Sequence, residues 1–295
     1  MATKTAMITI AGRPNVGKST LTNFLVGEKI AIVSNKPQTT RNRICGIVTK
    51  DDTQYVFVDT PGYHKARTKL GDYMVNVTKS SIADVDMTIM MVEPIASIGP
   101  QEQGLIDQLK ASRCPVVLAI NKIDSVEKDI LLEVIALYSQ AADFAAIIPI
   151  SAKTGDGVEE LLKVCHKYAV ESPFLFPEDS TTDQPERQVM AEIIREKLLW
   201  TLDREVPHGT AVEITKFSER DNGIIDIDAT IYCEKASHKG IIIGKQGAML
   251  KKISSMARTD CEKFMGTRVY LTTWVKVKEN WRDSDFLVRN FGYRE

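Results

Sequence analysis

Short apolar runs alternate with longer amphipathic segments over the first 170 residues of the chain. The runs that predict strands span residues 6–11, 45–49, 55–59, 87–92, 115–121 and 146–150. The segments that predict helices span residues 18–26, 70–83, 99–111, 129–141 and 158–169. This alternation is typical of parallel strands joined by crossover helices. The pattern therefore predicts an α/β fold with a doubly wound, mostly parallel sheet.

The alternation stops between residues 172 and 185, where Pro, Asp, Ser and Thr predominate and no periodicity is sustained. Beyond this stretch the pattern predicts a helix over 186–202 and a pair of hairpin strands over 210–217 and 224–233. A helix that begins near residue 237, a helix over 248–264 and a strand over 268–277 follow. The order α, β, β, α, α, β indicates a second, smaller α+β domain. We therefore expect a first domain over residues 1–172, a linker over 173–185 and a second domain over 186–295.

Composition narrows the class of protein. The chain of 295 residues exceeds one typical domain of about 100–200 residues, and its hydrophobic content of 43% is enough for two packed cores. A formal net charge of −1 argues against a protein that coats nucleic acid along its whole surface, so any site for a polyanion must be local. The five cysteines are scattered and form no C-x-x-C pair, which indicates reduced thiols in a cytoplasmic protein.

A phosphate-binding motif lies between the first predicted strand and the first predicted helix. It reads Gly12-Arg13-Pro14-Asn15-Val16-Gly17-Lys18-Ser19, followed by Thr20, and it matches G-x-x-x-x-G-K-[ST]. Glycines allow backbone N–H groups to surround phosphates, and the helix N-terminus adds the positive end of its dipole. In such a motif Lys18 neutralises the β- and γ-phosphate oxygens, and the Ser19 hydroxyl holds Mg²⁺.

Two further motifs follow predicted strands, at the edge of the sheet where ligands bind. The first reads Asp59-Thr60-Pro61-Gly62; its carboxylate can reach Mg²⁺ through water, and the amide of its glycine can sense a γ-phosphate. The second reads Asn121-Lys122-Ile123-Asp124; its last carboxylate can accept both the N1–H and the N2–H of guanine, an arrangement that adenine lacks. A companion turn after the sixth predicted strand would meet the guanine oxygen through a backbone amide, and it reads Ser151-Ala152-Lys153. The motifs therefore predict selection of GTP over ATP.

These four motifs, in this order, resemble those of the translation-factor-type GTPases over the first 170 residues. A switch segment is expected between the phosphate motif and Asp59, at Gln38-Thr39-Thr40-Arg41. One of its two threonines would supply a hydroxyl to Mg²⁺ and the γ-phosphate. We favour Thr40, and Thr39 is the alternative.

Tyr63 directly follows the glycine of D-x-x-G, where Ras-type enzymes place the glutamine that orients the attacking water. An aromatic side chain cannot polarise water as an amide does. We therefore expect slow hydrolysis that relies on Lys18, Thr40, the Gly62 amide and Mg²⁺. Asn15 resembles the asparagine that helps to hold K⁺ beside the phosphates in several GTPases with a hydrophobic residue at this switch position, which implies K⁺ as a further cofactor.

The second predicted domain contains a G-x-x-G loop between two predicted helices, which reads Ile243-Gly244-Lys245-Gln246-Gly247. KH domains use such a loop to clamp about four nucleotides of single-stranded RNA. The segment from residue 239 to residue 278 contains nine basic and two acidic residues. The basic residues nearest the loop include Lys239, Lys251 and Lys252. The order of elements also matches the prokaryotic type of KH fold, so the sequence predicts RNA binding here.

Two tryptophans of this domain have competing roles. Trp274 and Trp281 either stack on bases or belong to the core, and Tyr270 and Phe264 are expected in the core.

The motif G-R-P-N-V-G-K-S, the switch Q-T-T-R and a single KH-like domain together resemble the Era family of ribosome-assembly GTPases along nearly the whole chain. The resemblance implies that GTP favours binding to the 3′ end of 16S ribosomal RNA in the assembling 30S subunit, and that hydrolysis to GDP favours release. It also implies peripheral association with the inner membrane. We expect a monomer that does not bind DNA.

A different class of function would use the same motifs. In that alternative the chain is a non-catalytic guanine-nucleotide switch, and its C-terminal domain binds a protein or a membrane.

Overall fold

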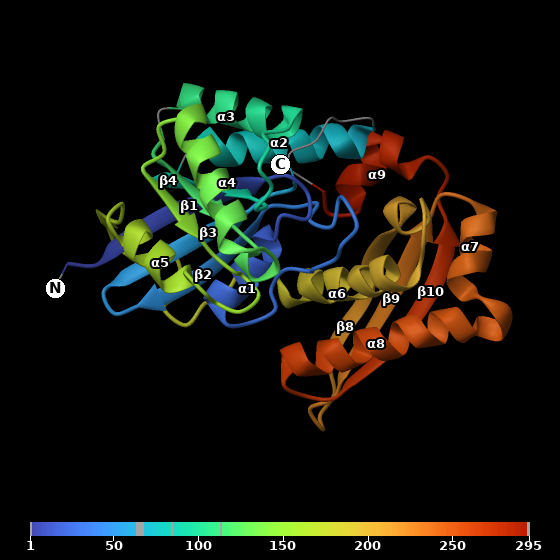
Figure 1. Cartoon of the computed structure of the whole chain (residues 1–295). Coiled ribbons are helices and arrows are strands. Elements are labelled where there is room, and N and C mark those ends of the chain that lie inside the picture. The colour runs from blue at the N-terminus through green and yellow to red at the C-terminus, as the bar shows by residue number, and fades with distance from the viewer. Residues whose placement is uncertain (1, 63–67, 84, 113, 294–295) are drawn as a thin grey trace. The chain divides into compact units, whose positions relative to one another are not determined.

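The computed structural model describes residues 2–62, 68–83, 85–112 and 114–293 (Figure 1). Contacts between residues divide the chain into two compact units. The first unit comprises Met1–Ala31, Thr40–Lys65 and Met74–Asp183, and the second comprises Ile32–Thr39, Ala66–Tyr73 and Gln184–Glu295. Two short segments of the N-terminal half are thus grouped with the C-terminal unit. The domain limits expected from composition stay a prediction.

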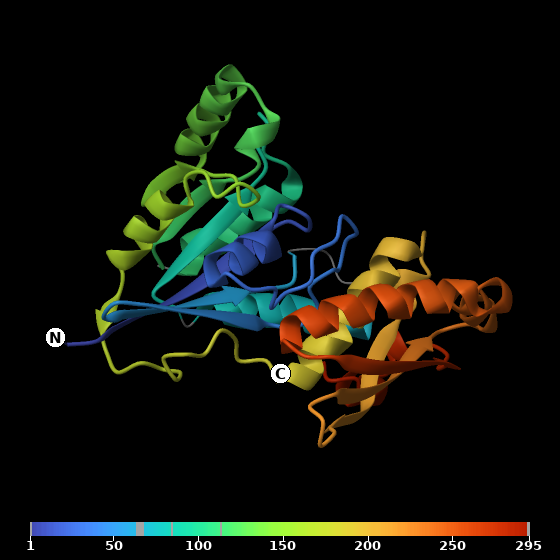
Figure 2. The same cartoon turned by 90° about the horizontal axis from the view of Figure 1, so that it is seen from below.

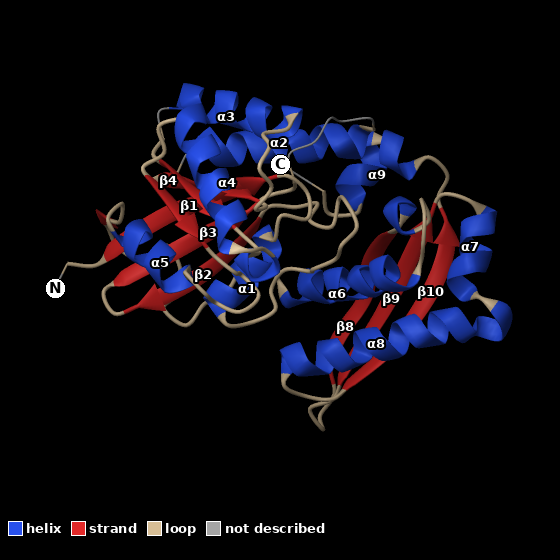
Figure 3. Ribbon diagram, viewed as in Figure 1, coloured by secondary structure: helices blue, strands red, loops and turns tan. Residues whose placement is uncertain are grey.

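The first unit is built on a mostly parallel sheet (Figure 3). Its main strands are β1 (Lys4–Gly12), β2 (Ile44–Lys50), β3 (Thr53–Asp59), β4 (Met87–Val92), β5 (Val116–Ile120) and β6 (Ala146–Pro149). They are ordered β2-β3-β1-β4-β5-β6, and within this order only β2 runs antiparallel to its neighbour. Every residue of β4 is buried, as expected for a parallel strand that is covered on both faces.

Helices cover both faces of this sheet. They are α1 (Lys18–Val26), α2 (Lys69–Ala83), α3 (Pro100–Ser112), α4 (Lys128–Ala141) and α5 (Val158–His166), with a short 3₁₀ helix, η1 (Ile123–Ser125). Side chains of α1 and α5 pack with Ile89 and Met91, whereas those of α2, α3 and α4 pack with Met90 and Val92. Successive residues of β4 therefore serve opposite cores, because side chains alternate along a strand. The α/β class predicted from the sequence is confirmed.

A small element escaped the sequence analysis. The predicted helix 158–169 ends at His166, and β7 (Val170–Glu171) then pairs antiparallel with β1. A two-residue strand is too short to show a periodicity. The chain beyond it, expected to be a linker, lies along the sheet: the amides of Leu175 and Phe176 donate to the Gln54 side chain, and the amide of Ile47 donates to the Thr181 carbonyl.

The second unit has a three-stranded sheet ordered β10-β9-β8, whose strands are labelled in Figure 1 and seen from below in Figure 2. Its elements are α6 (Glu186–Thr201), η2 (Pro207–Gly209), β8 (Ala211–Glu219), β9 (Ile225–Cys233), α7 (Ala236–Ile243), η3 (Lys245–Gly247), α8 (Ala248–Met265), β10 (Val269–Val277), η4 (Trp281–Asp283) and α9 (Asp285–Asn290). Central β9 is parallel to β10 and antiparallel to β8. Apolar side chains of α6 and α8, among them Ile194 and Ile253, pack on one face of the sheet. The predicted order α, β, β, α, α, β is confirmed, and α9 is an addition to it.

The aromatic residues of this unit divide between core and surface. Trp281 is fully buried, its Nε1 donates to the Gly209 carbonyl at 2.9 Å, and its ring stacks on Tyr293, so it belongs to the core. Trp274 and Tyr270 are 59% and 60% exposed. The expectation that Tyr270 lies in the core was wrong, because the neighbouring Val269 and Leu271 point to the helix-covered face and Tyr270 points to the other.

The segment 32–39 packs within the second unit against α6. The amide of Val33 donates to a Glu196 carboxylate oxygen at 2.9 Å, and Trp200 Nε1 donates to the Val33 carbonyl at the same distance. The guanidinium of Arg195, fully buried, donates to the Thr39 carbonyl. These bonds fix the backbone on the N-terminal side of Thr40.

Candidate nucleotide and RNA sites

The phosphate motif forms the turn between β1 and α1. Its second glycine, Gly17, has a φ of 104°, in the left-handed region, and a Cβ there would lie 2.2 Å from Nδ2 of Asn121. Asn121 Nδ2 instead donates to the Val16 carbonyl at 2.7 Å, and Val16 itself is buried in the core. Only glycine satisfies both the backbone angle and the close approach. The turn therefore presents its amides at the start of α1.

Lys18 is the buried cation of this turn, with 6% of its surface exposed. Its ammonium donates to the carbonyl oxygens of Gly12 and Arg13 at 3.2 and 3.0 Å. Burial lowers the pKa of Lys18 to about 8, and the nearby Asp59 carboxylate opposes that shift. An ammonium held in so little water interacts strongly with a phosphate.

Three oxygen-bearing side chains meet beside Lys18. Ser19 Oγ donates to Asp59 Oδ2 at 2.6 Å, and it shares a hydrogen bond of 2.9 Å with Thr40 Oγ1. Burial raises the pKa of Asp59 to about 6, against the opposing effects of Lys18 and of hydrogen bonds from Ser19 and Thr40. The other carboxylate oxygen, Oδ1, is buried and has no hydrogen-bond partner within the described ranges.

This set fits a small hard cation, because all of its donors are oxygens and one is a poorly solvated carboxylate. No group of three or more His, Cys, Asp or Glu suited to a metal occurs among the described residues. Thr39 lies apart from this oxygen set: its Oγ1 donates to the Lys36 carbonyl at 2.6 Å. Of the two threonines considered, Thr40 is the one beside Ser19.

The D-x-x-G turn lies directly against the phosphate loop. Thr60 Oγ1 donates to the Ile10 carbonyl at 3.0 Å, which ties the turn to β1, and the Pro61 carbonyl accepts from Thr78 Oγ1. A Cβ on Gly62 would lie 2.6 Å from the backbone nitrogen of Pro14, so this position requires glycine. Tyr63 lies outside the described residues. Of the other switch residues, Arg41 is buried, and Gln38 has a φ of 59°.

The base-recognition motif and its companion turn are joined by side-chain hydrogen bonds. Asn121 Oδ1 accepts from the Ala152 amide at 2.8 Å, and Ser151 Oγ donates to Asp124 Oδ1 at 2.7 Å. Asp124 and Lys153 are exposed. A carboxylate held from one side by a serine hydroxyl keeps acceptor capacity for the two donors of a guanine edge.

Two glutamates at this edge of the sheet were missed by the sequence analysis. Glu93 follows β4 directly and Glu102 lies in the first turn of α3, and both pair with Arg13 of the phosphate loop. Carboxylates in these positions match no motif, so only their contacts identify them.

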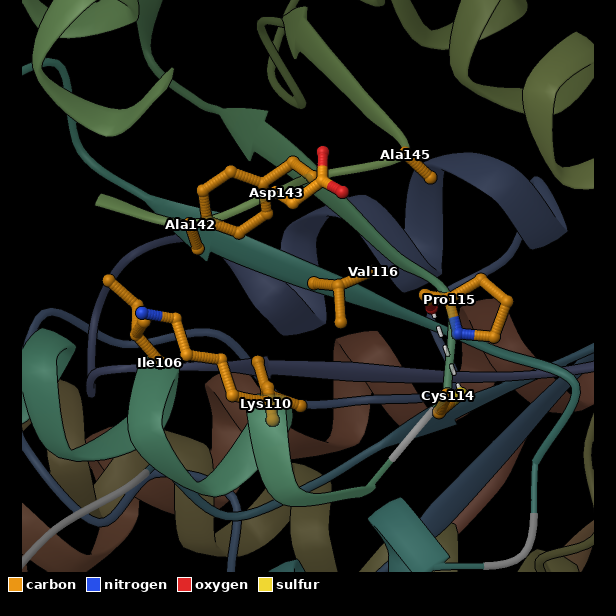
Figure 4. A pocket seen from close by; sticks show the side chains of 10 residues that line it. Ile106, Lys110, Cys114, Pro115, Val116, Ala142, Asp143 and Ala145 are labelled. Carbon is orange, nitrogen blue, oxygen red and sulfur yellow. Dashed lines mark hydrogen bonds between the residues drawn. The ribbon is translucent and has the colours of Figure 1, made fainter. Parts of the chain in front are cut away.

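A cavity of about 470 Å³ lies elsewhere on the first unit (Figure 4). Its lining runs along α3, the start of β5 and the connection from α4 to β6, and includes Ile106, Lys110, Cys114 and Asp143. Because it lies at the amino end of β5, whereas Asn121 follows the carboxyl end, this cavity is not the nucleotide site.

The G-x-x-G loop joins α7 to α8. Gly244 and Gly247 have φ angles of 71° and 80°, and Gln246 between them has a φ of 51°. A Cβ on Gly244 would lie 2.6 Å from the Cβ of Met249, whereas nothing lies within 4 Å of one on Gly247. Ile243 packs against the core. The exposed loop backbone at Gln246 can therefore approach a nucleic-acid strand closely.

Lysines surround this loop. Lys245, Lys251 and Lys252 are exposed and Lys239 is half-buried. They form a positive surface at the start of α8, in a chain whose net charge is close to zero.

Two family models match the chain: 50S ribosome-binding GTPase over residues 7–122, and KH domain over residues 205–282. The GTPase Era of Ruminiclostridium cellulolyticum is 53% identical over 294 residues, which cover 100% of this chain and 99% of that protein. The GTPase Era of Clostridium kluyveri is 53% identical over 291 residues, which cover 99% of each.

Solved structures agree with these relatives. Era in complex with MgGDPNP and nucleotides 1506–1542 of 16S ribosomal RNA superposes with a TM-score of 0.94 at 37% identity, over 99% of this chain and 100% of that one. A variant of Aquifex aeolicus Era bound to GDP.AlF4- gives the same values. Since a GTPase module and a KH module occur in the same order and half of the residues are shared along the full length, the chain belongs to the Era family of GTPases.

Proposed function

We propose that this chain binds GTP and GDP with Mg²⁺, hydrolyses GTP slowly, and binds 16S ribosomal RNA near its 3′ end to assist maturation of the 30S subunit. The observation that carries the nucleotide half is the meeting of Ser19, Thr40 and Asp59 beside the buried Lys18. The RNA half is supported by the exposed lysines around the G-x-x-G loop and by the complex of the 37% identical Era with nucleotides 1506–1542.

The chain's own residues account for most of the chemistry. Lys18 and the amides before α1 would hold the phosphates, and Ser19, Thr40 and Asp59 would hold Mg²⁺. The metal, when bound, neutralises charge that develops on the phosphate oxygens. Thr60 keeps the turn at Gly62 in place, so that the glycine amide lies beside the phosphate loop.

The expected slowness follows from Tyr63, since this position carries no amide to orient water. We infer that Asn15 helps to hold K⁺, which would replace part of the missing stabilisation. Asn15 has a φ of 68°, and its carbonyl accepts a hydrogen bond from Lys122 Nζ at 2.9 Å.

The setting of the protein is also proposed. We take it to be a cytoplasmic monomer with two domains over 1–172 and 186–295, which visits the inner membrane peripherally and does not bind DNA. All five cysteines are free thiols, and four are buried, in keeping with a reducing compartment. Among the described residues, no helix combines the length and the hydropathy that a membrane span requires.

Thr40→Ala should weaken Mg²⁺-dependent binding of a GTP analogue by about tenfold, because the variant lacks a hydroxyl beside the charged centre. Thr39→Ala is the matched control and should leave affinity nearly unchanged. Titration of a fluorescent analogue with Mg²⁺ and with EDTA measures both. An equal decrease in affinity in the two variants would contradict the assignment of Thr40.

Asp124→Asn should shift base preference from guanosine to xanthosine triphosphate, because an amide donates where the carboxylate accepted. Competition of the two nucleotides against a labelled GDP gives the preference. Asp129→Asn, in the first turn of α4, is the control that removes the same charge. Unchanged selectivity for guanosine in Asp124→Asn would refute the role of this carboxylate.

Hydrolysis should be faster in KCl than in NaCl at equal ionic strength, and Asn15→Ala should reduce that difference. Single-turnover phosphate release is the appropriate measurement. Equal rates of GTP hydrolysis by the wild-type protein in KCl and in NaCl would show that K⁺ is not a cofactor.

Replacement of Gly244 and Gly247 by aspartate should lower affinity for an oligonucleotide of the 16S RNA 3′ end at least about tenfold and leave basal GTP hydrolysis unchanged. Since Gly244 lies against Met249, thermal unfolding must show that the domain remains folded.

The exposed Lys245, Lys251 and Lys252 provide a second variant for RNA binding. Their triple replacement by alanine should make the logarithm of affinity depend less steeply on the logarithm of salt concentration. The slope should decrease by roughly one for each lysine that binds a phosphate in the unchanged protein. Absence of RNA binding by the unchanged protein would instead favour a protein or membrane partner.

A further inference from the structure

Four charged side chains form a cluster at the carboxyl edge of the first sheet. Two are cations of the loops described above: Arg13 from the phosphate loop and Lys122 from the base-recognition motif. Two are carboxylates from the connection between β4 and α3 and from the start of α3: Glu93 and Glu102. The carboxylates belong to none of the motifs that bind nucleotide.

Glu93 contacts both loops at once. Its Oε2 lies 3.3 Å from Arg13 Nη2, and its Oε1 pairs with Lys122 Nζ. The same ammonium donates to the Asn15 carbonyl at 2.9 Å, so Lys122 contacts the phosphate loop directly as well. One carboxylate thus joins the loop that would hold the phosphates to the loop that would read the base.

Glu102 contacts only one of these loops. Its Oε1 lies 2.6 Å from Arg13 Nε, and its Oε2 is buried without a hydrogen-bond partner within the described ranges. The Glu102 side chain is 7% exposed, compared with 24% for Glu93. Glu102 therefore anchors Arg13 to α3 and does not reach Lys122.

The order of strands explains why Glu93 has this place. β4 lies between β1 and β5 in the sheet, the phosphate loop follows β1, and the base-recognition motif follows β5. A residue directly after β4 lies between the two loops, because parallel strands end at the same edge. A glutamate there is long enough to pair with a cation on each side.

We propose that Glu93 is a positioning residue for guanine-nucleotide binding: by pairing with Arg13 and Lys122 together, it fixes the spacing between the phosphate and base subsites. The inference rests on the proposed nucleotide binding and deepens it. Without the carboxylate the two loops move more independently, and the nucleotide dissociates faster. The reacting phosphate is not touched, so the rate at saturating GTP stays the same.

Glu93→Gln tests the role of the charge with little change of shape. These pairs are more buried than free surface pairs and less buried than core pairs. We therefore expect the dissociation rate of a fluorescent GDP to rise about tenfold, equivalent to about 1.4 kcal/mol. The KM for GTP should rise with it, and kcat should stay within about twofold.

Glu102→Gln is the matched control, since it removes the same charge from the same cluster and leaves the bridge between the loops intact. Its dissociation rate should rise clearly less than that of Glu93→Gln. Equal increases in the two variants would mean that only the local charge matters, and the bridging role would be wrong.

Thermal unfolding of the nucleotide-free proteins separates positioning from general stability. The proposal is supported if Glu93→Gln unfolds at the same temperature as the wild type and releases GDP faster. It is overturned if the variant is less stable than the wild type and releases GDP at the wild-type rate. If the wild-type protein bound no guanine nucleotide, the proposed function itself would be wrong. If the wild type binds nucleotide and Glu93→Gln releases it at the wild-type rate, only the positioning role is wrong.

Discussion

The loops at the carboxyl edge of the first sheet surround two opposite charges that are buried close together, the ammonium of Lys18 and the carboxylate of Asp59. Burial moves both pKa values toward neutrality, to about 8 and about 6, and each group partly restores the charge of the other. Charges in such surroundings are costly unless they have partners. A polyanion beside the ammonium and a hard cation beside the carboxylate would satisfy both. The pair therefore favours a metal-bound phosphate over other ligands.

The sheet brings together the loops that serve this pair. Strands β1, β3, β4 and β5 end at one edge, so segments more than 100 residues apart in the chain meet there. Several hydrogen bonds hold the arrangement: Thr60 donates to Ile10 of β1, Asn121 donates to Val16 of the phosphate loop, and Ala152 donates to Asn121. The carboxylate of Glu93 belongs to the same system. The loops proposed to recognise the base and the phosphates are thus connected to one another.

The second unit carries a local positive surface around its G-x-x-G loop. In a chain with a net charge of −1, the proposed RNA site needs a local excess of positive charge, and exposed lysines gather at the start of α8. The left-handed glycines at 244 and 247 keep the loop free of side chains that would hold a strand at a distance. The opposite face of the sheet carries the exposed Tyr270 and Trp274, which the helices do not cover.

The sequence alone determined the motifs and most of the elements; the short β7 and α9 are exceptions. Helix α1 and strand β4 begin and end at the predicted residues, because periodicity and the phosphate motif are local properties of the chain. Only the tertiary structure decided that Thr40 lies beside Ser19, that Glu93 lies between two loops, and that Tyr270 faces outward. A strand pattern predicts only that the side chains of adjacent residues point to opposite faces of the sheet. Which face is covered, and which distant residues meet, depends on the order of strands and on the packing of helices against them.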